Sequence, residues 1–132
     1  MFAIDHLGIA VRSLEQSKQF YEKLGIRVMP EETVEQEKVR LAMVPLGESR
    51  IELLEPTSED SPIAKFLAKR GEGLHHVSLR VSDLPGTVER LKKSGVRLVT
   101  DKIQVGAGGH LYVFVHPSSA GGVLLELCEE QH

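Results

Sequence analysis

Four residues that could bind a metal ion fall at matching places in a sequence that repeats itself: His6, Glu52, His76 and Glu126. The two histidines lie 70 positions apart (76 − 6), and the two glutamates lie 74 positions apart (126 − 52). Imidazole and carboxylate groups together suit a divalent ion such as Co, Mn, Ni, Fe, Zn or Mg, six-coordinate with two positions open to substrate. The lack of thiolate ligands argues against a closed structural zinc site. The spacing therefore outlines a substrate-binding metal site built by both copies.

The repeat extends well beyond these four residues. Three stretches of the first copy match stretches of the second, namely 4–14 with 74–84, 20–28 with 90–98, and 51–55 with 125–129. Each copy opens with a segment that bears the His and closes with a segment that bears the Glu. Modules related by a twofold axis would bring the two His and the two Glu together.

Each copy is expected to fold as a β-α-β-β-β module. Apolar alternation and turn signals predict, in the first copy, strands at 4–11, 26–34, 38–45 and 49–55 and a helix from the Ser13 cap to about Leu24. The same signals predict, in the second copy, strands at 74–81, 96–100, 110–115 and 122–128 and a helix at 84–94. A linker helix from Ser61 to about Lys69 joins the copies.

These elements predict an α+β fold with a single domain over residues 1–132. Two tandem βαβββ modules (about 1–56 and 74–132, joined by a linker helix at about 57–73) would form a curled mixed-sheet cleft with the helices outside. Side chains alternate between the faces of a strand, so the aliphatic residues of the four ligand-bearing strands share one face and the His or Glu takes the other. The aliphatic faces can pack beneath helices, which leaves the ligands inside the cleft.

Simpler interpretations compete with the metal site. A single strand histidine is usually a hydrogen-bonded residue and a single glutamate is usually solvated, so each residue alone has a prior of roughly one in ten for a functional role. The duplication raises that prior, because a carboxylate inside an apolar strand is costly unless it is paired or bound to a cation. His75 has the opposite parity to His76 and is expected to face away, either as a packing residue or as a residue that supports a ligand.

Structural or solvated roles are expected for the remaining candidates: Cys128, His110, His116, Glu55, Glu129 and Glu130. Cys128 ends an apolar strand, where a buried thiol is more common than a nucleophile. The glycine-rich turn 106–109 does not follow a strand and open a helix, so it is not a dinucleotide-binding fingerprint. It is expected to be a hairpin loop.

The composition is that of an ordinary soluble globular protein, with 41% hydrophobic and 27% charged residues. A net charge of −3 gives no reason to expect nucleic acid as a partner. No apolar run is long enough to span a bilayer, and no signal peptide is recognisable. The single Cys allows no internal disulfide, which fits a reducing compartment, and we expect a cytoplasmic protein without a membrane partner.

Five stretches carry a family resemblance: 4–11, 51–56, 60–67, 73–77, and 116–117 running into 122–127. With the Ser61-Pro62-Ile63 helix start and the Gly73-Leu74-His75-His76 turn, the chain resembles the vicinal oxygen chelate superfamily over nearly its whole length. That superfamily includes glyoxalase I, extradiol dioxygenases and antibiotic-resistance proteins. Within it the chain is most similar to the methylmalonyl-CoA epimerases.

The resemblance implies metal ligands at His6, Glu52, His76 and Glu126, with one divalent ion per chain and Co most favoured. It implies interconversion of (R)- and (S)-methylmalonyl-CoA through a metal-stabilised enolate, with Glu126 as the first catalytic base. Some epimerases have Gln at the position of Glu52. The family often places a second Glu on the strand after a Glu-Gln segment, where this chain has Arg40 and Leu41. The second acid is therefore open between Glu52, a bound water and another group in the cleft.

Two alternatives remain at this point. A glyoxalase I-type lactoylglutathione lyase, or a related thiol-adduct isomerase, would use the same four ligands. A non-catalytic binding protein of the resistance-protein type would need no metal quartet, so the four ligands count against it. The resemblance also implies an acyl-CoA substrate and a homodimer, and uncovered strand edges make self-association reasonable.

Overall fold

The computed structural model describes residues 2–129 of the chain, which form two compact units. The first unit is His6–His75. The second unit combines the chain up to Asp5 with the chain from His76 onward. The boundaries fall inside β1 (Ala3–Ala10) and β5 (Gly73–Arg80), which are the two strands that carry the histidines.

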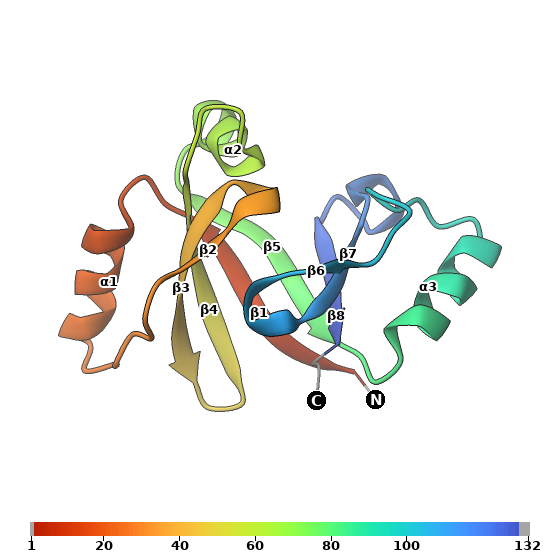
Figure 1. Ribbon diagram of the computed structural model, residues 1–132, viewed down its shortest axis with the longest axis horizontal. Helices are drawn as coiled ribbons and strands as arrows, with labels where there is room; N and C mark the ends of the chain where they lie inside the picture. Colours follow the sequence, from red (N-terminus) through yellow and green to blue (C-terminus); the bar gives the residue numbers. More distant parts are fainter. Residues whose placement is uncertain (1, 130–132) are drawn as a thin grey trace. The chain divides into compact units, whose positions relative to one another are not determined.

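The first unit contains three further strands and two α-helices (Figure 1). They are α1 (Leu14–Lys23), β2 (Glu32–Val34), the short 3₁₀ turn η1 (Glu35–Glu37), β3 (Val39–Leu46), β4 (Ser49–Pro56) and α2 (Pro62–Arg70). The strands follow the order β2-β3-β4-β1, with β1 parallel to β4 and the other pairs antiparallel. Helix α1 packs against β3 and β4, and α2 packs against β4.

The second unit repeats this plan without a counterpart of α2. It contains α3 (Leu84–Lys93), β6 (Gln104–Val105), η2 (Ala107–Gly109), β7 (Leu111–Val115), η3 (Pro117–Ser119) and β8 (Leu125–Glu129). The strands follow the order β5-β8-β7-β6, with β5 parallel to β8 and the other pairs antiparallel. Both halves of the chain therefore have the predicted β-α-β-β-β order.

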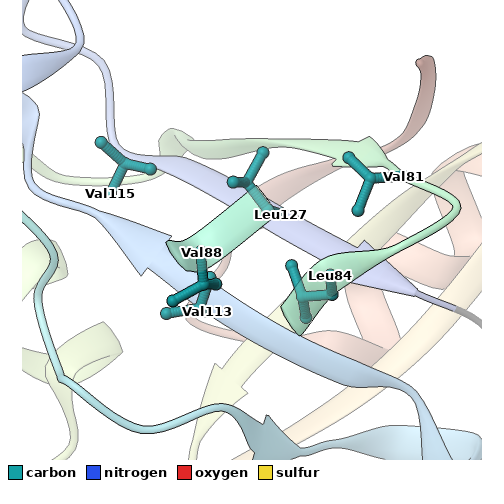
Figure 2. Close-up of a cluster of buried hydrophobic side chains, with 6 residues drawn as sticks. All are labelled: Val81, Leu84, Val88, Val113, Val115 and Leu127. Carbon is teal, nitrogen blue, oxygen red and sulfur yellow. The ribbon is translucent and has the colours of Figure 1, made fainter. Parts of the chain in front are cut away.

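Each unit buries one face of its strands beneath its own helix. In the second unit the buried cluster is Val81, Leu84, Val88, Val113, Val115 and Leu127 (Figure 2). In the first unit it is Val11, Leu14, Ala42, Val44 and Leu53. Leu14 and Leu84 open the two helices and are 1% and 0% exposed. The aliphatic strand faces pack beneath helices, as alternation predicts.

The helix caps confirm the sequence signals. Ser13 accepts a hydrogen bond from the backbone N–H of Gln16 at 3.2 Å, and Ser61 accepts one from Ile63 at 3.1 Å. Gly25 follows α1 with φ = +91°, a conformation that costs glycine little, and its N–H donates to the carbonyl of Glu22.

One predicted strand is partly right and another is wrong. Of the predicted strand 26–34, only Glu32–Val34 (β2) is a strand. Residues 96–100 form no strand apart from one isolated bridge between Leu98 and Val115, and the strand of this region is β6, later in the chain. Ile26 donates back to the carbonyl of Tyr21 in α1, and the side chains of Ile26 and Leu98 pack against the buried clusters beneath the helices.

The expectation that Glu55 and Glu129 are solvated charges is also wrong. A Glu55 carboxylate oxygen accepts the backbone N–H of Leu14 at 2.7 Å, and Glu129 accepts that of Leu84 at 2.6 Å. Each glutamate thus satisfies a free N–H at the start of its unit's helix, where a negative charge is favourable. Glu130 lies outside the described residues.

Among the described residues, no helix is long and apolar enough to cross a membrane.

Candidate metal and acid–base site

In the first unit the structure brings His6 and Glu52 together. The Nε2 atom of His6 lies 3.4 Å from Oε1 of Glu52. The two residues are 5% and 8% exposed. Strand β1 supplies the histidine and its parallel neighbour β4 supplies the glutamate, because the pairing of Gly8 with Glu52 puts both side chains on one face.

In the second unit the structure brings His76 and Glu126 together in the same way. The Nε2 atom of His76 lies 3.9 Å from Oε1 of Glu126, and the two residues are 4% and 8% exposed. Here β5 and β8 are the parallel pair, and Ser78 is the partner of Glu126. A buried histidine–carboxylate pair is therefore built twice, with the same strand register.

The antiparallel neighbours repeat the register as well. Met43 of β3 is paired with Glu52, and Phe114 of β7 is paired with Glu126. Directly paired residues project from the same face, so each carboxylate has one large side chain beside it on that face. Phe114 also packs edge-to-face on His76, with ring centroids 5.5 Å apart.

The donor chemistry of both pairs fits a divalent ion. Bonds of about 2.0–2.2 Å to nitrogen and oxygen place two neighbouring ligand atoms about 3.0 Å apart at an octahedral ion and about 3.4 Å apart at a tetrahedral one. The separations of 3.4 and 3.9 Å are near these values. Burial of two carboxylates is also costly unless cations or hydrogen bonds compensate their charge. Each unit offers one imidazole and one carboxylate to such an ion.

The remaining histidines have local structural contacts. His75 packs edge-to-face on Phe66 of α2, with centroids 5.0 Å apart, which agrees with its predicted packing role. His116 accepts the backbone N–H of Ser118 at 3.0 Å through Nδ1 and thereby caps η3. Its role in this turn is structural. His110 is partly buried, and its carbonyl accepts the N–H of Gly106 in the β6–β7 hairpin.

Cys128 is a buried thiol, as expected, and is 2% exposed. The Ser78 hydroxyl donates to its sulfur at 3.4 Å.

The positions where the family often has a second glutamate provide no acid. Arg40 pairs with the carboxylate of Glu55, and this hydrogen bond raises the pKa of the guanidinium above its ordinary value. Leu41 is 3% exposed and is paired in the sheet with Leu54. Leu41 lies on the same face as Met43 and Glu52, but its side chain cannot transfer a proton.

Sequence reasoning missed Phe114 and Tyr112. Their rings contact each other edge-to-face at 5.8 Å, and Phe114 in turn contacts His76. The alternation of two aromatic residues along one face of β7 was visible in the sequence. Their proximity to the His76 ring depends on the strand order β5-β8-β7, which the sequence does not reveal.

Comparison with known proteins agrees with this architecture. Residues 5–114 match the model of the glyoxalase/bleomycin resistance protein/dioxygenase superfamily. The mitochondrial methylmalonyl-CoA epimerase of Homo sapiens is 38% identical over 94% of this chain and 72% of its own length. The ethylmalonyl-CoA/methylmalonyl-CoA epimerase of Cereibacter sphaeroides is 35% identical over 94% of this chain and 95% of its own length.

Solved structures show the same fold. The crystal structure of methylmalonyl-CoA epimerase from Mycobacterium tuberculosis is 39% identical, with a TM-score of 0.93 over 98% of this chain and 88% of that one. A Streptomyces coelicolor methylmalonyl-CoA epimerase in complex with 2-nitronate-propionyl-CoA is 38% identical, with a TM-score of 0.93 over 97% of this chain and 94% of that one. The predicted fold class is therefore confirmed. This chain belongs to the glyoxalase/bleomycin resistance protein/dioxygenase superfamily, also called vicinal oxygen chelate, and groups there with the methylmalonyl-CoA epimerases, which are isomerases.

Proposed function

We propose that this protein interconverts the (R) and (S) forms of methylmalonyl-CoA by moving a proton at C2. The observation that carries the proposal is the buried histidine–carboxylate pair, which is built at the same register in each unit. The similarity to methylmalonyl-CoA epimerases over 94% of the chain supports the choice of substrate.

His6, Glu52, His76 and Glu126 are the proposed ligands of one divalent ion per chain, with Co favoured by the family resemblance. Such an ion, when bound, would stabilise the negative charge that develops on the substrate oxygens when C2 loses its proton. An all-nitrogen-and-oxygen donor set suits a catalytic ion with open positions better than a structural one.

The side chains of the chain itself carry the proton. Glu126 takes the C2 proton on one face of the substrate, and the electron pair of the broken C–H bond passes into the thioester carbonyl. A second acid returns a proton to C2 on the opposite face. That acid is Glu52, a bound water or another group of the site, because Arg40 is paired with Glu55 and Leu41 cannot donate. In the reverse reaction the acid and the base exchange roles.

Exchange of the C2 hydrogen of methylmalonyl-CoA in deuterated water tests this function. The proposal predicts exchange that stops when a chelator removes the metal and resumes when Co²⁺ is restored. Absence of exchange with every divalent ion tried, together with turnover of methylglyoxal–thiol adducts, would instead identify a glyoxalase-type lyase. Tight binding of the thioester without any turnover would identify a non-catalytic binding protein.

We also expect the protein to be a homodimer. Phe2 and Ile4 are 61% and 51% exposed near the start of β1, and exposed apolar groups of this kind favour association. Light scattering coupled to size-exclusion chromatography would measure the state directly.

A further inference from the structure

The His76 imidazole has an aromatic neighbour on its own unit's sheet. Phe114 packs its ring edge-to-face on His76 at a centroid distance of 5.5 Å and an interplanar angle of 88°. Phe114 is also the direct partner of Glu126 across the β7–β8 pair. One side chain therefore lies beside both members of the second unit's histidine–carboxylate pair.

Phe114 is itself held in place. Its ring meets that of Tyr112 edge-to-face, with centroids 5.8 Å apart, and Tyr112 is 5% exposed. The backbone of Gly106 approaches the Tyr112 ring so closely that a Cβ at Gly106 would lie 3.0 Å from the ring carbon Cε1. The contacts thus run from the β6–β7 hairpin through two rings to His76.

The first unit places a different side chain at the equivalent position. Met43 is paired with Glu52 in the β3–β4 register, where the second unit has Phe114 paired with Glu126. Met is unbranched, with three rotatable bonds, and adapts its shape, whereas a phenyl ring keeps a fixed plane. The two histidine–glutamate pairs have the same strand register, but the Met43 side chain beside Glu52 is more flexible than the Phe114 ring beside Glu126.

We propose that Phe114 is a positioning residue, which holds the His76 imidazole at the angle needed for His76 and Glu126 to bind the metal ion together. The inference rests on the proposed function, which makes these residues ligands. The contribution of an edge-to-face aromatic contact corresponds to about a 2- to 10-fold change in affinity. Phe114 acts through His76 and is not itself a catalytic residue.

The test compares three variants with the wild type in the metal-free and Co²⁺-loaded states. Phe114→Met introduces the residue of the other unit, and a swap between side chains of similar volume is tolerated best. Phe114→Tyr keeps the ring. Met43→Leu is the matched control, because it changes the equivalent neighbour of Glu52 by a similarly small step. Calorimetric titration with Co²⁺ measures metal affinity, and C2 proton exchange measures kcat and KM.

Phe114→Met is expected to weaken Co²⁺ binding about 2- to 10-fold and to lower kcat with KM nearly unchanged. Phe114→Tyr, which keeps the ring, and Met43→Leu should both bind Co²⁺ as tightly as the wild type. Wild-type Co²⁺ affinity in Phe114→Met, or an equal loss in Met43→Leu, would overturn the inference.

The His76 ring resonances in the NMR spectrum of the metal-free protein separate the two proposals. An aromatic ring at this distance shifts them, so Phe114→Met must move the His76 signals whereas Met43→Leu must not. Unchanged His76 signals in Phe114→Met would sink the positioning role alone. If the wild-type protein binds no divalent ion, the proposed function is contradicted. The NMR comparison would still decide whether Phe114 orients His76.

Discussion

The two units carry the same buried histidine–glutamate pair in different surroundings. In the first unit, Ala10 and Leu54 lie two residues after Gly8 and Glu52 and are paired with each other. Leu41 of β3 is paired with Leu54 from the other side. At the corresponding positions the second unit pairs Arg80 with Cys128, and β7 adds Tyr112. Next to the histidine–glutamate pair, the first unit thus has aliphatic residues, whereas the second unit has polar and aromatic ones.

The linker helix accounts for part of this difference. Helix α2 packs against β4, buries Ile63 and Leu67, and has no counterpart in the second unit. The guanidinium of Arg12 donates a hydrogen bond to the carbonyl of Leu67 in this helix at 3.4 Å. In the second unit the backbone of Gly106 packs on Tyr112. The comparison indicates that strand register, which both units share, positions the histidine–glutamate pairs. The helix or hairpin that packs against the strands differs between the units without changing this register.

The largest expected effect tests whether the two carboxylates are equivalent. Glu126→Gln should slow C2 proton exchange by about 10²- to 10⁴-fold, the usual contribution of a positioned base. Glu52→Gln should cause a loss of that size only if Glu52 is the second acid, because some epimerases have Gln at this position. Glu89→Gln, on the exposed face of α3, is the control and should leave the rate unchanged. A wild-type rate in Glu126→Gln would contradict its role as the base, and a small loss in Glu52→Gln would assign the second step to a bound water or another group.

A second prediction compares the two cores. Leu14→Ala and Leu84→Ala remove side chains that are 1% and 0% exposed at the same position of α1 and α3. Each should lower the free energy of unfolding by about 2–5 kcal/mol, because a buried cavity is left behind. Urea denaturation measures this. A loss below about 1 kcal/mol in either variant would show that the cluster around it collapses to fill the space.

A third prediction concerns the glutamates that cap the helices. Glu55→Gln and Glu129→Gln should each lower the free energy of unfolding by about 0.5–2 kcal/mol, by weakening the hydrogen bond to the first helical N–H. Glu55→Gln should cost more, because Arg40 also loses its charged partner. Glu59→Gln, an exposed residue, is the matched control. Equal losses at the two caps would mean that Arg40 adds nothing.

The smallest effect is confined to the linker of the first unit. Lys38 and the Ser58 hydroxyl both bind the Asp60 carboxylate and lower its pKa from 3.8 to about 2. A lowered folded-state pKa contributes stability above pH 3.8, and this contribution is lost as the pH falls toward 2. Wild-type urea midpoints should therefore fall more steeply than those of Asp60→Asn over this range. Parallel curves would contradict the ion pair.

The sequence predicted the repeat, the caps and the two histidine–glutamate pairs because each depends on local pattern. Alternation along β1 and β4 decides which face His6 and Glu52 share, and the structure pairs them as expected. Ser13 and Gly25 mark the ends of α1 by chemistry that needs no distant partner.

The rest depends on partners that a linear pattern does not identify. Residues 96–100 alternate like a strand, but Val96 bonds back to α3 and its side chain packs on the buried cluster. Glu55 looked solvated because the N–H of Leu14 that it binds is 41 residues away. Phe114 acquires its contact with His76 only through the order of strands β5, β8 and β7.

The number of divalent ions bound per chain tests the central claim most directly. Metal-free protein titrated with Co²⁺ should take up one ion, and both His6→Ala and His76→Ala should abolish tight binding. Two ions per chain, or an unchanged affinity in either variant, would show that the duplicated pairs are independent and would contradict the shared centre.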